Sequence, residues 1–230
     1  MSSNLGATRE KVIQSLCRVI RALVKLEVVG AENVPETGGF VLATSHISRL
    51  DTPFLMVATS RTNVIPMVAH DYKKTPLIGW FLEKMGVIWI NREGYDFQAF
   101  REASSFLKKG WIVGLAPEGT RSKTGALMEG KPGAALLALK SKAKIIPAAV
   151  IGSADMKKWF LKLKKMRVTV MLGEPFDLPQ IKEGPKEKDR LEMATTEIMC
   201  HIALLLPEER RGFYANHPRF KVLLEEQKSS

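Results

Sequence analysis

The sequence predicts an α/β fold in which a largely parallel central sheet is flanked by helices and preceded by an amphipathic N-terminal helix. Short β-rich runs alternate with helical stretches, and several runs are almost wholly apolar, as strands buried on both faces are. The apolar fraction of 45% and the charged fraction of 26% are those of an ordinary globular protein. Within the 230 residues, we expect residues 1–30 to form the N-terminal helix and residues 31–230 one folded domain.

The helical pattern near the N-terminus covers residues 11–26. At about 100° per residue its apolar side chains fill one half of the wheel, while the other half is polar and mostly basic. Such a helix suits the boundary between lipid headgroups and acyl chains, which predicts a membrane-associating role for residues 1–30. A helix that covers the protein's own core fits the same pattern, and the sequence leaves this alternative open.

The remaining elements follow from shorter patterns. Strands are predicted over residues 40–43, 64–68, 86–90, 112–115, 145–150 and 168–172. Helices are predicted over residues 53–60, 76–85, 97–109, 132–142 and 191–206. Residues 184–190 form a charged connector that contains Pro and Gly, and the polar tail after Pro207 is expected to be peripheral.

The chain is strongly basic, with 35 Lys and Arg against 24 Asp and Glu and a formal net charge of +11. This charge indicates an anionic partner, and nucleic acid, an anionic membrane and phosphorylated substrates all fit it. The two cysteines lie in helical apolar patterns, so we expect buried thiols rather than a disulfide or a zinc site. The four histidines lack the clustered spacing of metal ligands, and no metal is expected.

The sequence contains no run of 18 or more apolar residues and no secretory signal pattern. We therefore expect a protein that stays on the cytosolic side and lies on a membrane without spanning it. A second basic segment, residues 157–165, interleaves lysines with aromatic and aliphatic residues, a mixture suited to anionic headgroups. An acidic carrier protein, or solvent alone, is the alternative partner of that segment.

The first candidate catalytic residues, His46 and Asp51, follow a buried strand and precede a helix, where open α/β sheets place ligand sites. On a continuous helix the two side chains would point about 140° apart, so a working pair requires the loop to curl back. If it does, Asp51 fixes the tautomer of His46 and leaves the other ring nitrogen free as a base. The alternative for Asp51 is a helix N-cap.

A second candidate loop, residues 117–122, reads Pro-Glu-Gly-Thr-Arg-Ser and also follows a buried strand. The guanidinium of Arg121 suits phosphate oxygens, and Glu118 suits a substrate hydroxyl or an ion pair with Arg121. A polar turn with an internal ion pair is the alternative. At the end of the predicted strand 86–90, Arg92 emerges at the same sheet edge, although taken alone it is a surface arginine.

Together these motifs resemble those of the glycerophospholipid acyltransferase family, which includes the lysophosphatidate acyltransferases. The matching blocks are His-x4-Asp at residues 46–51, residues 86–92, residues 117–122 and the proline-centred residues 146–148. Pro76 to Trp80 and Lys131 to Ala134 add weaker similarity. The four blocks occur in the family's order at compatible spacing, over residues 40–152.

The resemblance implies that residues 31–230 form an acyltransferase domain with His46 as general base and Asp51 as its orienter. It assigns the acceptor's phosphate and glycerol to the second and third blocks, namely to Arg92, Glu118, Gly119, Thr120 and Arg121, and it lets Pro147 shape the site. The sequence departs from the family at Asn91, where many relatives carry Asp. It also carries His70 where relatives carry a lysine near the reacting carbonyl, and His70, Lys73 and Lys74 are the alternatives for that contact, with His70 and Lys73 as the candidate oxyanion contacts.

By this resemblance the expected function is 1-acyl-sn-glycerol-3-phosphate acylation at the sn-2 hydroxyl, which yields phosphatidate for phospholipid biosynthesis. Acyl-CoA or acyl-carrier protein would be the donor, no cofactor is implied, and the enzyme would lie peripherally on the cytoplasmic face of the cell membrane. Another lysophospholipid or glycerol 3-phosphate is the alternative acceptor. A basic nucleic-acid-binding or membrane-binding module would explain the charge but not the His-Asp pair, so no nucleic-acid partner is expected.

The expected route is direct transfer, because no Gly-x-Ser-x-Gly elbow occurs and both cysteines are expected to be structural. A covalent route through Ser45 or Ser48, both close to His46, is the alternative.

Overall fold

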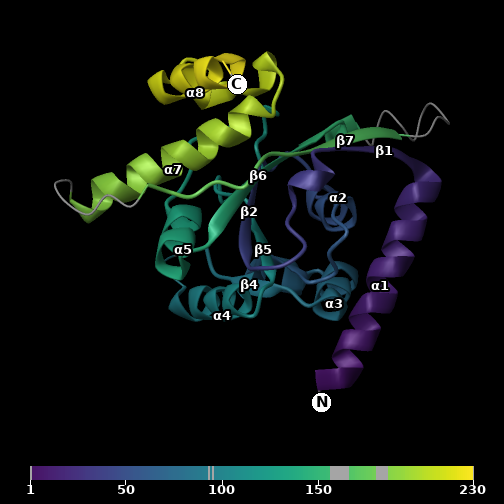
Figure 1. Cartoon of the computed structure of the whole chain (residues 1–230). Coiled ribbons are helices and arrows are strands. Elements are labelled where there is room, and N and C mark those ends of the chain that lie inside the picture. The colour runs from purple at the N-terminus through teal and green to yellow at the C-terminus, as the bar shows by residue number, and fades with distance from the viewer. Residues whose placement is uncertain (1, 93, 95, 156–165, 180–185, 230) are drawn as a thin grey trace.

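The computed structural model describes residues 2–92, 94, 96–155, 166–179 and 186–229. A seven-stranded sheet lies between two layers of helices (Figure 1). The strands are β1 (Val24–Val29), β2 (Phe40–Thr44), β3 (Val64–Ala69), β4 (Ile88–Ile90), β5 (Ile112–Leu115), β6 (Lys144–Ile151) and β7 (Met166–Leu172). The α-helices are α1 (Ser2–Leu23), α2 (Asp51–Ala58), α3 (Pro76–Met85), α4 (Phe97–Lys108), α5 (Gly133–Ser141), α7 (Glu187–Leu204) and α8 (Pro218–Ser229).

The sheet has the strand order β1-β7-β6-β2-β5-β3-β4. All neighbouring pairs from β6 to β4 are parallel. Strand β7 runs antiparallel to β6, and the edge strand β1 pairs in parallel with β7. The predicted α/β fold with a largely parallel sheet is therefore confirmed. Since β2 and β5 are parallel neighbours, the loops that follow them meet at one edge of the sheet.

Both faces of the sheet are covered, which explains the unbroken apolar runs in the sequence. On one face Val41 and Ala43 of β2 pack in a core with residues of α4, α5, α7 and α8. On the other face Phe40 and Leu42 pack with residues of α1, α2 and β7. Successive residues of a strand point to opposite faces, so each central strand contributes to both cores.

The predicted N-terminal helix is wrong at its end, because α1 stops at Leu23 and residues Val24–Val29 form strand β1. Half-buried and exposed residues alternate along β1, the period-2 pattern of an edge strand that lies against β7. The apolar face of α1 packs against α2 and α3, with Ile13 and Ile20 buried. This helix thus covers the protein's own core, while a membrane role for residues 1–30 stays a prediction.

The expectation of a peripheral tail after Pro207 is also wrong. Two short 3-10 turns, η4 (Glu208–Arg210) and η5 (Gly212–Tyr214), lead into α8, which packs against α7. Tyr214 and Phe220 are each 2% exposed and belong to the main core. Few apolar residues suffice to bury this segment, which is why its polar composition was misleading. The predicted basic segment at residues 157–165 lies outside the described residues.

Candidate active site

His46 and Asp51 come together at the end of β2, where Nδ1 of His46 lies 3.3 Å from Oδ2 of Asp51. The His46 side chain is 15% exposed and lines a cavity, whereas the Asp51 side chain is 2% exposed. With Nδ1 donating to the carboxylate, Nε2 is the unprotonated nitrogen of the neutral ring. No hydrogen bond from the described residues occupies Nε2, so it is available to accept a proton.

The loop between His46 and Asp51 curls back because the Asp51 carboxylate accepts hydrogen bonds from two backbone N–H groups of that loop. Oδ2 accepts hydrogen bonds from the backbone nitrogens of Ile47, at 2.8 Å, and Ser48, at 2.7 Å. Oδ1 accepts a hydrogen bond of 2.6 Å from the hydroxyl of Ser153. Four polar groups thus surround one buried carboxylate, which compensates for its removal from water. The curl expected from the sequence is present, and Asp51 is the first residue of α2.

The loop at residues 117–122 holds the backbone of His46 on both sides. The His46 N–H donates to Oε1 of Glu118 at 2.9 Å, and the Ser122 N–H donates to the His46 carbonyl at 2.8 Å. The second oxygen of Glu118 accepts from the backbone nitrogen of Met128 at 2.9 Å. Burial raises the pKa of Glu118, and the two backbone donors oppose that rise. The two loops meet because they follow β2 and β5, which are parallel neighbours in the sheet.

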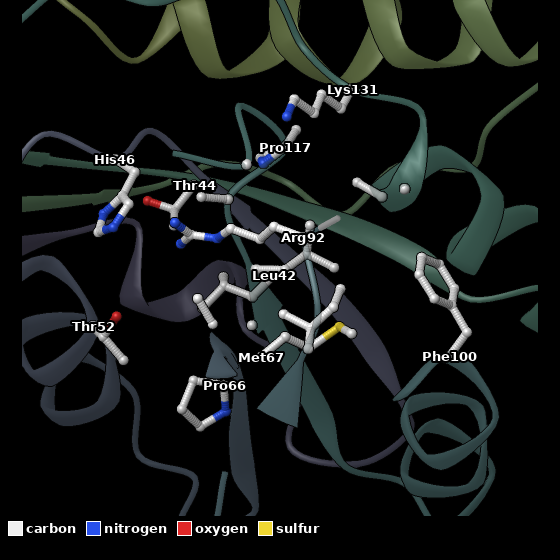
Figure 2. Close-up of a pocket in the computed structure, with 18 of the residues that line it drawn as sticks. Leu42, Thr44, His46, Thr52, Pro66, Met67, Arg92, Phe100, Pro117 and Lys131 are labelled. Atoms are coloured by element: carbon white, nitrogen blue, oxygen red, sulfur yellow. The ribbon is translucent and has the colours of Figure 1, made fainter. Parts of the chain in front are cut away.

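A cavity of about 480 Å³ opens beside His46. Most of its lining is apolar and comes from strands β2, β3 and β5 and helices α2 and α5, with Leu42, Leu55, Met56, Met67, Phe100 and Leu136 among the larger side chains. Its basic lining residues are His46, Arg92 and Lys131. Figure 2 shows the guanidinium of Arg92 pointing toward His46 and the Lys131 side chain extending toward the turn at Pro117. The cavity therefore pairs a base and two cations with room for an apolar chain.

The structure brings four of the predicted residues to the cavity wall, namely His46, Asp51, Arg92 and Gly119. Glu118, only 2% exposed, lies behind the wall with both oxygens bonded to backbone N–H groups. Thr120 and Arg121 are exposed and lie outside the lining. Their predicted contacts with the acceptor stay predictions.

The predicted secondary contacts also lie outside the cavity lining. His70 and Lys73 are exposed residues of η2 (His70–Lys74), and both lie near Trp89. The ring centres of His70 and Trp89 are 6.0 Å apart, and Nζ of Lys73 is 5.2 Å from the centre of the Trp89 ring. Pro147 is buried in β6 opposite Ala43 of β2. It lies in the sheet beneath the loop that carries His46.

Two residues of the site, Ser153 and Lys131, were not predicted from the sequence. Ser153 follows β6, far from His46 in sequence, and only the pairing of β6 with β2 brings its hydroxyl to Asp51. Lys131 precedes α5, and its backbone N–H donates to the Pro117 carbonyl at 2.8 Å. A Cβ at Gly119 would lie 3.1 Å from Cδ of Lys131, so the glycine leaves room for the lysine stem to cross the loop. The similarity at residues 131–134 was the one sequence signal for Lys131.

Metal ligands are not clustered here: among the described residues, no group of three or more His, Cys, Asp or Glu side chains could hold a metal ion. The hydroxyl of Ser45, 1% exposed, points into the protein without a hydrogen-bond partner and lies outside the cavity lining. Ser48 accepts a hydrogen bond from the backbone of Leu50.

Comparison with known proteins places these features in a family context. The pattern of the acyltransferase family matches residues 25–151. A 1-acyl-sn-glycerol-3-phosphate acyltransferase of Bacillus subtilis is 31% identical over 182 residues, which cover 77% of this chain and 86% of the relative. An enzyme of the same name from Borreliella burgdorferi is 29% identical over 129 residues, or 55% of this chain and 51% of the relative. The crystal structure of the 1-acyl-sn-glycerophosphate acyltransferase PlsC from Thermotoga maritima shares the fold, with a TM-score of 0.60, 22% identity and coverage of 85% of this chain and 80% of that chain.

Proposed function

The chain belongs to the acyltransferase family, and on that premise we propose that it acylates the sn-2 hydroxyl of 1-acyl-sn-glycerol 3-phosphate to make phosphatidate. The observation that carries the proposal is the His46–Asp51 pair at the wall of an apolar cavity that also presents Arg92. The name of the Bacillus relative supports the choice of acceptor. Acyl-CoA or acyl-carrier protein supplies the acyl group as a thioester.

The reaction begins when Nε2 of His46 takes the proton of the acceptor hydroxyl as its oxygen attacks the thioester carbonyl carbon. Because a glycerol hydroxyl is a very weak acid, a neutral imidazole in hydrogen-bond reach is the suitable base. Asp51 holds the ring through Nδ1 and stabilises the imidazolium that forms. The tetrahedral species then reforms the carbonyl, the carbon–sulfur bond breaks, and the imidazolium returns its proton to the leaving sulfur.

Arg92 and Lys131 bind the acceptor phosphate in this proposal. A phosphate monoester carries up to two negative charges, and these two side chains are the Lys and Arg residues of the cavity lining. Among the described residues, no carboxylate lies within ion-pair distance of either cation, so both charges are free for a ligand. Lys131 thus joins the residues that the sequence assigned to the acceptor.

The direct route needs no acyl-enzyme. Ser45 lies buried away from the cavity lining, which argues against its use as a nucleophile. The apolar lining fits an acyl chain, which the donor or the acceptor can supply, and the name of the Bacillus relative favours an acylated acceptor over glycerol 3-phosphate.

We place the enzyme peripherally on the cytoplasmic face of the membrane that supplies its lipid acceptor. In the part of the chain that the structure describes, no helix is both long and apolar enough to cross a bilayer.

The test is turnover of a labelled acyl-CoA with 1-acyl-sn-glycerol 3-phosphate by the wild-type protein and by His46→Ala. We expect labelled phosphatidate from the wild type and a loss of at least a hundredfold in the variant. His217→Asn is the matched control, because His217 lies outside the cavity lining and Asn can still accept the hydrogen bond from the Arg219 backbone. The assay is repeated with labelled acyl-carrier protein as donor. No product with either donor, or equal turnover by His46→Ala, would refute the proposal, and product from glycerol 3-phosphate alone would change the acceptor.

A further inference from the structure

The first two turns of α3 present two large apolar side chains to solvent. Leu77 is 82% exposed, the highest value among the large hydrophobic residues that the structure describes, and Trp80 is 60% exposed. Residues three apart lie on the same face of a helix, so the two side chains project side by side. Single exposed apolar residues are ordinary, but a pair that includes a tryptophan is a candidate contact with a partner.

Basic side chains border this pair. Lys73 and Lys74, both exposed, end η2 directly before α3. Arg49, also exposed, places its guanidinium 6.0 Å from the ring centre of Tyr72 in the same η2 turn. Asp71 of η2 and Glu83, one turn after Trp80 on α3, are exposed acids. They are outnumbered by the exposed cations, namely Arg49, Lys73, Lys74 and Lys84. The surface therefore combines an apolar centre with a cationic rim.

This surface adjoins the reactive edge of the sheet. Arg49 lies three residues after His46, in the loop between His46 and Asp51. The turn η2 starts directly after Ala69, which lines the cavity. A partner bound through α3 and η2 would therefore lie beside the loop that carries the base.

We propose that Arg49, Lys73, Lys74, Leu77 and Trp80 form a docking surface for an anionic lipid bilayer. Leu77 and Trp80 enter the boundary between headgroups and acyl chains, while the three cations contact lipid phosphates. The proposal rests on the proposed function, because an acylated acceptor resides in the same bilayer. A lipid bilayer accommodates apolar and cationic groups side by side, and the high exposure of Leu77 favours it over an acidic carrier protein recognised chiefly through charge.

Trp80 supplies a direct readout of insertion through quenching of its fluorescence by brominated lipid tails. The measurement uses vesicles of phosphatidylglycerol and phosphatidylcholine in a Trp159→Phe background, which removes the tryptophan of the second basic segment. We expect quenching of Trp80, and its loss when Trp80→Phe is added. Quenching that is absent, or unchanged by Trp80→Phe, would overturn the proposal.

The energetic test compares vesicle affinity of the wild type and of Leu77→Ser/Trp80→Ser. Exposing these two side chains to water instead of lipid weakens binding to phosphatidylglycerol vesicles by roughly tenfold or more. The matched control is Phe213→Ser/Val222→Ser, which removes two exposed apolar residues near the C-terminus and should change affinity less than twofold. Equal losses in both pairs, or a loss of carrier-protein binding without any loss of vesicle affinity, would contradict a lipid surface.

Turnover separates this proposal from the proposed function. With a short-chain, monomeric 1-acyl-sn-glycerol 3-phosphate, Leu77→Ser/Trp80→Ser should react as fast as the wild type, whereas with acceptor embedded in anionic vesicles it should be severalfold slower. Equal slowing on both forms of acceptor would overturn the docking role. A wild type that makes no phosphatidate would refute the proposed function, while the vesicle affinities would still decide the docking surface.

Discussion

The carboxylate of Glu118 accepts a hydrogen bond from the backbone N–H of His46, with 2.9 Å between Oε1 and the nitrogen. Its other oxygen binds the Met128 N–H, and the side chain is 2% exposed. The acidic residue of the Pro-Glu-Gly-Thr-Arg-Ser loop thus acts on the base through the backbone. We infer that Glu118 is a positioning residue for His46.

Glu118→Ala should lower both stability and kcat. The change leaves the N–H groups of His46 and Met128 without their acceptor, at a cost of about 2 to 4 kcal/mol in the free energy of unfolding for the two. Urea denaturation measures that loss, and steady-state assays measure kcat and KM. An increase in KM alone, with unchanged stability, would instead indicate direct contact between Glu118 and the acceptor.

Ser153→Ala should lower kcat by roughly threefold to thirtyfold with little change in KM, because Asp51 loses a charge-assisted hydrogen bond of 2.6 Å and orients His46 less firmly. Ser153→Thr keeps a hydroxyl and should recover part of kcat. Ser104→Ala, which removes a hydroxyl paired with Ser141 away from the site, is the control and should leave kcat unchanged. An unchanged kcat in Ser153→Ala would show that the other partners of Asp51 suffice.

Lys131→Met should raise the KM for 1-acyl-sn-glycerol 3-phosphate by roughly tenfold or more, since a charge-assisted contact with phosphate is lost. Lys131→Arg keeps the charge and should stay within about threefold of the wild type. Lys140→Met removes an exposed lysine of α5 outside the cavity lining and should have no effect. A fall in kcat at constant KM would move Lys131 from the phosphate to the reacting carbonyl.

Arg219→Met should destabilise the protein in a manner that depends on pH. Burial raises the pKa of Glu197, but the hydrogen bonds and charges of Arg219 and His201 outweigh it and bring that pKa to about 2. A carboxyl whose pKa is lowered by folding stabilises the protein above its unfolded pKa, near 4.5, and loses that contribution as pH falls toward 2. The loss at pH 7 should be about 1 to 3 kcal/mol, because Arg219 is 36% exposed and solvent screens the pair.

Urea denaturation of the wild type and of Arg219→Met from pH 7 to pH 3 checks this expectation. The gap in the free energy of unfolding should shrink below about pH 4.5. A gap that stays constant over this range would mean that Arg219 stabilises the α7–α8 contact through packing of its side chain rather than through its charge.

The sequence predicted the central elements closely because their signals are local. Apolar runs flanked by turn residues located β2, β3, β5 and β6 to within one or two residues, and the helix at Pro76–Met85 was predicted at both ends. The edge strand β1 was missed, since its alternation continues the apolar pattern of α1 and only pairing with β7 distinguishes the two. The C-terminal segment was missed because its burial depends on α7.

The same distinction between local sequence signals and long-range contacts applies to the candidate site. Residue types and spacing determined, from the sequence alone, which side chains could act as base, orienter and phosphate ligand, because chemical capacity belongs to the residue. Only the tertiary structure decided which of them meet: the parallel pairing of β2 with β5 put Glu118 behind His46, and the pairing of β2 with β6 brought Ser153 to Asp51. Local apolar patterns located the strands, but the order of the strands in the sheet depends on contacts between residues distant in sequence, so only the folded chain brought these side chains together.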